Sequence, residues 1–242
     1  MKAGPRLTVG KSARAAGRHV SKEGYALKSV RVWFSKTGPA RYISHLDLTR
    51  CMGRALKLSR LPVWYTEGFN PHIYMTFAMP LSLGVSGLRE CMDIRLTEDT
   101  DLAQAAQILD AQLPEDISVL EIFEPELGFD AVAYAEYEIS LDSEEPEALA
   151  DILEELMAQD TVIVMKHGKK GDKEFDIKPH FTLLDKQAGH GLLKIKLRAS
   201  CSQAGSVNPS LLLEALKSYK NLEPYAEITR SRLLTKDFFD MK

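Results

Sequence analysis

Residues 27–58, LKSVRVWFSKTGPARYISHLDLTRCMGRALKL, place a strand pattern directly before a helix pattern. At the start of this stretch the apolar side chains alternate, with Val30, Val32 and Phe34 on one face. Alternation of this kind is typical of a strand with one buried face. The stretch therefore predicts a βα unit at the beginning of the folded chain.

The helix of this unit has a start signal, a buried stripe and a stop signal. Ser44 is the expected N-cap, and Asp47, three residues later, is its capping partner near the positive end of the helix. Leu61 and Pro62 end the helix, because the residue before a proline avoids helical geometry. The residues expected to be buried recur at helical spacing and are Leu48, Cys51, Met52, Ala55 and Leu58.

After this unit, strand and helix patterns continue along the chain, and together with the unit they form two similar sets. The first set adds extended segments at 63–66 and 73–78, a strand at 91–96, a helix at 101–113 and a strand at 117–123. The second set has strands at 132–141, 161–166, 191–199 and 226–234, with helices at 146–157 and 209–219. Residues 168–189 give no readable pattern. The order βαββαβ, found twice, predicts an α+β protein built from two tandem ferredoxin-like domains.

The expected division of the chain has three parts. Residues 1–26 are rich in Gly, Ala, Ser and basic side chains and predict a disordered basic arm. The first ferredoxin-like domain is expected at 27–126 and the second at 127–242. The 45% hydrophobic content is enough for a core in both.

Charge is distributed unevenly along the chain, although the net charge is only −3. Residues 1–60 carry 14 Lys and Arg against two acids, whereas residues 61–242 carry 17 against 32. Between Leu96 and Met165 there are 20 acids and no Lys or Arg. A basic beginning favours contact with a polyanion, and a long acidic stretch opposes it. A merely solvated surface is the alternative for both segments.

Several classes of protein are disfavoured by what the sequence lacks. It has no apolar run long enough to span a membrane and no apolar core of a secretory signal. Its three cysteines are scattered, which favours a reducing, cytoplasmic compartment. It contains no metal-ligand motif, phosphate-binding loop or dinucleotide fingerprint, so we expect no metal, cofactor or small-molecule substrate.

Three blocks of sequence carry a resemblance to a known family. They are RYISHLDLTR at 41–50, LPVWYTEGFNPH at 61–72 and FAMPLSLG at 77–84. The chain resembles the radical SAM-linked proteins of bacteria, which are encoded beside, or fused to, a cobalamin-binding radical SAM protein. The resemblance implies an intracellular bacterial protein and a radical SAM protein as its partner. It implies no known reaction.

A fainter resemblance is to the repeat-cutting endoribonucleases of CRISPR systems, which are also built on ferredoxin-like repeats. This resemblance implies that His45 acts as a general base for attack by a ribose 2′-OH. Tyr42 and Arg50 are then the nearby candidates to support developing negative charge. The alternative, which we favour from helix geometry, is that His45 and Asp47 only fix the entry of the helix through hydrogen bonds.

Basic and aromatic residues in the same region predict an RNA-binding surface. Arg50, Arg54 and Lys57 lie opposite the apolar stripe of the helix, and Lys36 and Arg60 are expected to extend their patch. Aromatic rings and cations together suit single-stranded RNA, because bases stack on rings while phosphates meet Lys and Arg. A solvated helix face, core aromatics and turn chemistry at Asn70 and His72 are the alternatives. The RNA-binding candidates are Arg41, Arg50, Arg54, Lys57, Phe69, Asn70 and His72.

The functional expectation is an RNA-binding accessory protein that works with a radical SAM enzyme in tRNA or rRNA modification. Two alternatives stay open, a metal-independent endoribonuclease and a subunit that binds only other proteins. We favour a non-catalytic role.

Overall fold

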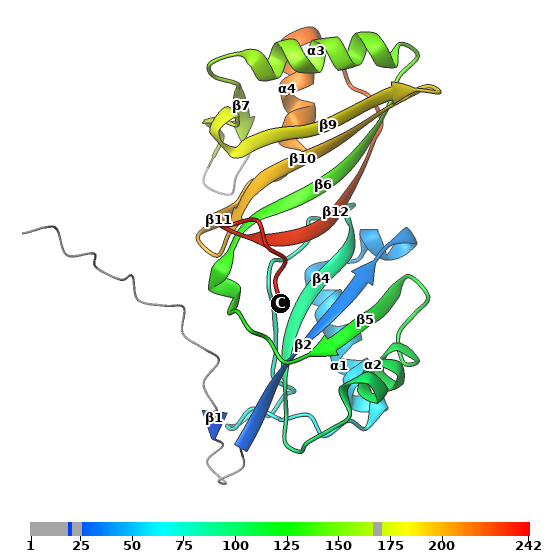
Figure 1. Cartoon of the computed structure of the whole chain (residues 1–242), viewed down its shortest axis with the longest axis vertical. Helices are drawn as coiled ribbons and strands as arrows, with labels where there is room; N and C mark the ends of the chain where they lie inside the picture. Colours follow the sequence, from blue (N-terminus) through cyan, green and yellow to red (C-terminus); the bar gives the residue numbers. More distant parts are fainter. Residues whose placement is uncertain (1–18, 21–25, 167–170) are drawn as a thin grey trace, which may run out of the picture.

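The computed structural model describes residues 19–20, 26–166 and 171–242 and shows a mixed α+β fold (Figure 1). Within the described residues one large sheet carries four α-helices. The predicted α+β class is confirmed. The expected arm at residues 1–26 lies outside the described residues, apart from Ala26 and the two-residue strand β1 (His19–Val20), which pairs with the next strand.

The helices and strands follow one another in two sets. The first set is β2 (Ala26–Lys36), η1 (Gly38–Tyr42), α1 (His45–Ser59), β3 (Met75–Phe77), β4 (Ser86–Leu96), α2 (Leu102–Asp110) and β5 (Ile117–Phe123). The second set is η2 (Phe129–Ala131), β6 (Val132–Asp142), α3 (Pro146–Ala158), β7 (Ile163–Lys166), β8 (Lys173–Asp176), η3 (Lys178–His180), β9 (Phe181–Gly189), β10 (Leu192–Ser202), β11 (Gly205–Ser206), α4 (Leu211–Lys220) and β12 (Ala226–Thr235).

Each set forms an antiparallel part of the sheet. The first part has the strand order β5-β2-β4-β3, and the second has the order β12-β6-β10-β9. A short parallel pairing of β12 with β4 joins the two parts, through Thr229 with Ser86 and Arg230 with Gly87. Figure 1 shows α1 and α2 with the first part and α3 and α4 with the second.

Helix α1 forms where its residues predict it, but two residues of its expected buried face differ, since Cys51 is only half-buried and Leu58 is exposed. The Ser44 hydroxyl accepts a hydrogen bond from the Asp47 amide at 3.1 Å, as expected of an N-cap. Leu48, Met52 and Ala55 are buried, but Leu58 is 55% exposed. At about 100° per residue Leu58 lies on the edge of the stripe opposite Leu56, and Leu56 is the side chain that packs into the core.

The expected strand at 161–166 is present, but its expected place as the second strand of the second set is wrong. Residues 161–166 contain β7, but this strand pairs only with β8, in a separate two-stranded sheet. The place beside β10 belongs to β9, within the segment 168–189 that gave no pattern. Helix α4 begins at Leu211, two residues after the expected start, because the Asn208 side chain accepts from the Ser210 amide and forms a turn first.

A buried ion pair lies where the two parts of the sheet meet. The Arg230 guanidinium on β12 binds both carboxylate oxygens of Glu90 on β4, with Nε to Oε1 at 2.9 Å. Each side chain is less than 5% exposed. Gly87 allows this approach, because a Cβ there would lie 2.5 Å from Glu90 Oε1. The pair therefore ties β4 to β12 at the junction.

Candidate nucleic-acid interface

The outer face of α1 carries exposed cations, as predicted. Arg50, Arg54 and Lys57 are all exposed, and Arg60 follows them at the C-cap with a positive φ of 57°. Arg50 is 3.2 Å from the Asp47 carboxylate, an exposed i,i+3 pair of little energetic weight. Among the described residues Arg54, Lys57 and Arg60 form no ion pair. We call these three residues the α1 basic patch.

Two cations expected on this surface are placed elsewhere. Lys36 is only 2% exposed, because it continues the inward alternation of Val32 and Phe34 on β2. Its Nζ lies 3.5 Å from the carbonyl oxygens of Arg41 and Ile43, and burial lowers its pKa. Arg41 binds Glu227 on β12 at 3.0 Å, which raises the pKa of Arg41 further above its usual range. Including Lys36 in a surface patch was wrong.

A hairpin follows directly after α1. Its two sides are joined by hydrogen bonds from the Tyr74 amide to the Trp64 carbonyl at 3.0 Å and from the Thr66 amide to the His72 carbonyl at 2.8 Å. The tip, residues 67–71, contains Phe69, whose side chain is 105% exposed relative to a reference chain. We call residues 63–74 the aromatic hairpin. A fully exposed phenyl ring at a fixed tip is a surface for stacking or for an apolar contact.

Asn70 and His72 contribute to the turn itself. The His72 amide donates to the Thr66 hydroxyl at 3.2 Å, and His72 Nδ1 lies 3.0 Å from the same hydroxyl. The same Nδ1 is 3.1 Å from the Asn70 carbonyl oxygen. These contacts support the turn-chemistry interpretation of the two residues. Their binding role stays a prediction.

Arg95 is a residue of this region that the sequence interpretation missed. Its guanidinium carbon lies 5.2 Å from the centre of the Trp64 ring and 4.1 Å from the centre of the Tyr74 ring. Such contacts are favourable because a cation is attracted to the face of an aromatic ring. Arg95 comes from β4, so only the pairing of the strands reveals that it braces the base of the aromatic hairpin.

His45 lies at the other end of α1. Its ring meets the Phe77 ring edge to face, with centroids 5.0 Å apart. Burial, and then the charge of Lys36, lower the pKa of His45 below its usual value of 6.5. Asp47 fixes the helix entry as expected, because its amide donates to the hydroxyl of the N-cap Ser44 and its carboxylate accepts from that hydroxyl. His45 contributes through the packing of its ring.

The candidates for catalysis are only partly brought together. Tyr42, at the end of η1, is 59% exposed, with the Arg41 guanidinium 4.9 Å from its ring centre. Arg50 projects about 140° away from His45 around the helix and binds Asp47. Phe77 lies at the end of β3 farther from the tip of the aromatic hairpin. His45 and the aromatic hairpin therefore form two separate places on the surface.

Many acids of the 97–164 segment are paired with cations from elsewhere. Lys28 binds Asp99 and Glu124 at 3.0 and 2.9 Å. Glu136 holds both Arg198 and Arg232 at 2.8 Å, and these contacts lower the pKa of Glu136 although its burial acts in the opposite direction. The segment is thus less uniformly negative on the surface than its sequence suggests.

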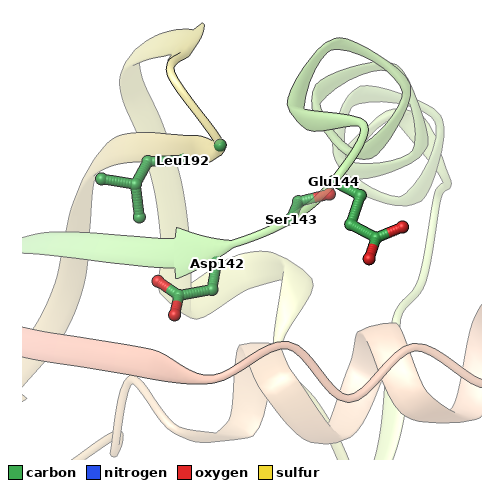
Figure 2. A pocket seen from close by; sticks show the side chains of 5 residues that line it. Asp142, Ser143, Glu144 and Leu192 are labelled. Atoms are coloured by element: carbon green, nitrogen blue, oxygen red, sulfur yellow. The ribbon is translucent and has the colours of Figure 1, made fainter.

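Acids without such partners gather where β6 leads into α3. Asp142, Glu144 and Glu145 are exposed and form no ion pair in the described part of the chain. Asp142 and Glu144 border a hollow of about 590 Å³, part of which Figure 2 shows, and Glu145 borders an adjoining one of about 310 Å³. Neither here nor at any other place in the described residues does a group of three or more His, Cys, Asp or Glu side chains have an arrangement that could hold a metal ion.

Comparison with known proteins gives a family. The family model described as "Uncharacterized protein conserved in bacteria (DUF2344)" matches residues 29–209. The chain belongs to this bacterial family. The match includes α1, the aromatic hairpin and most of the second part of the sheet, so the candidate residues lie within the family's own region. None of the helices in the described residues is long and apolar enough to cross a membrane.

Similarity beyond this bacterial family is distant. A chain in a solved structure, "Crystal Structure of a Cbf5-Nop10-Gar1 Complex", has a TM-score of 0.44 and 12% identity with this one. The similarity covers 84% of this chain and 48% of that chain, so this chain spans about half the length of the other. No curated protein matches the chain.

Proposed function

We propose that the chain is an RNA-binding accessory protein that works with a radical SAM enzyme in tRNA or rRNA modification. The observation that carries the proposal is that the exposed cations of the α1 basic patch come directly before the aromatic hairpin in the chain. Arg54, Lys57 and Arg60 have no acidic partner among the described residues, and the chain then runs directly to the exposed ring of Phe69. Unpaired cations can meet phosphates, and the ring can stack on a base.

The order of the strands also supports this proposal. The strand orders β5-β2-β4-β3 and β12-β6-β10-β9 support an arrangement as two βαββαβ units. In this proposal the chain consists of two tandem ferredoxin-like domains, at 27–126 and 127–242. The first domain holds RNA, and the second faces the partner protein.

The radical SAM partner is supported by the three blocks of sequence that resemble radical SAM-linked proteins. They fall on the start of α1, the aromatic hairpin and the loop before β4. A protein with no cofactor motif of its own would act by presenting RNA to an enzyme. A subunit that binds only protein is the alternative, and it predicts no salt-dependent retention of RNA.

Phe69→Ala is expected to weaken single-stranded RNA binding without destabilising the fold. The ring is fully exposed, so its removal leaves no cavity. Loss of one stacked base costs about 1–3 kcal/mol, or roughly 5- to 150-fold in Kd. Fluorescence anisotropy with labelled RNA measures this affinity, and thermal melting checks the stability.

Phe239→Ala is the matched control. Phe239 is also largely exposed, at 70%, but it lies after β12 near the C-terminal residue. Its replacement should leave RNA affinity unchanged. Equal losses in the two variants, or none in Phe69→Ala, would remove the aromatic hairpin from the proposed interface.

A metal-independent endoribonuclease is the second candidate, favoured by the environment of His45. With a pKa lowered by burial and by Lys36, His45 stays neutral at pH 7 and can accept a proton. It would take the proton of a ribose 2′-OH, whose oxygen attacks the adjacent phosphorus and expels the 5′ oxygen of the next nucleotide. The products would be a 2′,3′-cyclic phosphate and a 5′ hydroxyl.

His45→Ala should abolish cleavage in this second candidate and leave RNA affinity intact. The wild-type rate should stay constant from pH 8 down to about 6.5 and fall below it, because protonated His45 cannot act as a base. Protonation of His45 also destabilises the fold, because the pKa of His45 is lower in the folded chain than in the unfolded chain. Folding stability is therefore lost as the pH falls from about 6.5 through the folded pKa of His45. Gel analysis of labelled RNA across this range decides the matter. Uncut RNA with the wild-type chain would reject this candidate.

A further inference from the structure

Two adjoining hollows lie where β6 meets α3. The first, of about 590 Å³, is lined by Asp142, Ser143, Glu144, Gly191 and Leu192. Figure 2 shows the side chains of Asp142 and Glu144 on either side of Ser143, at the turn between β6 and α3. The second hollow, of about 310 Å³, shares Asp142 and Ser143 and continues between α3 and the segment that joins α4 to β12. We call the two together the acidic groove.

The rim of the acidic groove carries negative charge on a fixed backbone. Two backbone hydrogen bonds hold the turn, from the Asp142 amide to the Tyr225 carbonyl at 2.9 Å and from the Ser143 amide to the Gly191 carbonyl at 3.0 Å. The Ser143 hydroxyl also accepts a hydrogen bond from the Glu145 amide at 3.1 Å. Asp142, Glu144 and Glu145 form no ion pair among the described residues, whereas Glu223 is 2.9 Å from Lys217. The rim therefore presents three uncompensated carboxylates.

The second hollow of the acidic groove has a mixed lining. Its apolar residues are Ala148, Leu149, Ile152, Leu222 and Pro224, and its polar residues are Asp142, Ser143, Glu145 and Glu223. A volume of about 310 Å³ is enough for one or two apolar side chains of an incoming segment. Apolar residues beside charged ones are the usual anatomy of a site at which a partner protein docks.

We infer that the acidic groove docks a basic amphipathic segment of another protein. An apolar side chain of that segment would enter the hollow between α3 and Leu222, and its Lys or Arg side chains would meet Asp142, Glu144 and Glu145. Complementary charge would raise the association rate and fix the orientation of the segment. The same carboxylates repel phosphates, so RNA is not the occupant. The inference rests on the proposed work with a partner protein and not on RNA binding.

The test uses the full chain and two labelled peptides. One peptide has lysine and leucine in amphipathic helical order, and the other replaces each lysine with glutamate. Fluorescence anisotropy at physiological salt should show binding of the lysine peptide alone. Glu144→Lys should weaken that binding by about 10-fold or more, because it replaces an attraction with a repulsion at the rim.

Asp160→Lys is the matched charge control. Asp160 is exposed beyond the other end of α3, roughly 20 Å away along the helix, and its replacement changes the net charge equally. This separation exceeds the Debye length of about 8 Å at physiological salt, so the affinity for the lysine peptide should change less than about 2-fold.

A second pair of variants tests the hollow. Ala148→Trp fills the groove without changing charge and should weaken binding of the lysine peptide, whereas Ala158→Trp on the exposed end of α3 should not.

Three results would overturn the inference. Equal losses in Glu144→Lys and Asp160→Lys would mean that net charge alone attracts the peptide. Undiminished binding to Ala148→Trp would mean that the hollow is not filled. Self-association of the wild-type chain that is lost in Glu144→Lys would mean that a second copy occupies the groove.

The RNA affinity of these variants should equal that of the wild type. A failure of the proposed RNA binding can therefore be told apart from a failure of peptide docking.

Discussion

Glu90→Ala is expected to lower the free energy of unfolding by about 3–5 kcal/mol, because it leaves the Arg230 guanidinium buried without its partner. Burial alone would lower the pKa of Arg230, but the charge and hydrogen bonds of Glu90 outweigh it and raise that pKa. Arg230 nevertheless stays charged when Glu90 is removed, because a guanidinium is not deprotonated in proteins. The buried Lys36 also loses the favourable charge of Glu90. Urea unfolding followed by circular dichroism measures the loss.

Two further variants identify the cause of this loss. Glu227→Gln removes another ion pair that joins the two parts of the sheet, the one with Arg41. That pair is exposed to solvent, so we expect little change in stability. Replacing both buried partners, as Glu90→Gln with Arg230→Met, should recover part of the loss because no unpaired charge remains. A Glu90→Ala protein as stable as the wild type would contradict the role given to the pair.

The regular elements of the fold follow from local patterns. Strand β2 and helix α1 were predictable because Val30, Val32 and Phe34 alternate and because Ser44 caps a helix with a clear apolar stripe. Strand β9 was missed because it lies at the edge of the sheet, where only Phe181 is fully buried and no sustained alternation results. Strand β7 was found, but its partner β8 is decided by contacts that a local pattern does not contain.

The residues of the candidate site also fall into those that local sequence predicts and those that it does not. Exposure of Arg54 and Lys57 follows from helical spacing and was predicted correctly. The burial of Lys36 follows from the alternation along β2, whereas the position of Arg41 depends on a distant residue, since Glu227 is 186 residues from Arg41 along the chain. Arg95 reaches Trp64 and Tyr74 only because β3 pairs with β4. Local sequence thus indicates which cations lie on the surface of α1. Contacts between residues far apart in the chain decide which other cations, such as Arg41 and Arg95, already have partners.

Replacing Arg54, Lys57 and Arg60 together by glutamate is expected to weaken RNA binding by about 100-fold, if each change removes one phosphate contact worth about 1 kcal/mol. All three side chains are exposed on the outer face of α1 or at its C-cap, so the fold should tolerate the change. The loss should be larger at low salt, because opposite charge in the patch then repels phosphates over a longer distance.

A second triple variant controls for net charge. Lys194 and Lys196 on β10, with Lys236 after β12, are also exposed, and their replacement by glutamate changes the net charge equally. Because they lie outside the α1 basic patch, their replacement should reduce the affinity far less. Equal losses in the two triple variants would place the RNA on no particular surface.

The salt dependence of RNA affinity tests the central claim most directly. Binding of a single-stranded RNA is measured over a series of salt concentrations for the wild type and for the Arg54, Lys57 and Arg60 triple variant. Each phosphate contact contributes roughly 0.7 to the slope of log affinity against log salt, so removing three should flatten the slope by about two units. A slope flatter by that amount is the result that RNA binding at the α1 basic patch predicts. Equal slopes for the two proteins, or no RNA binding by the wild type, would contradict it.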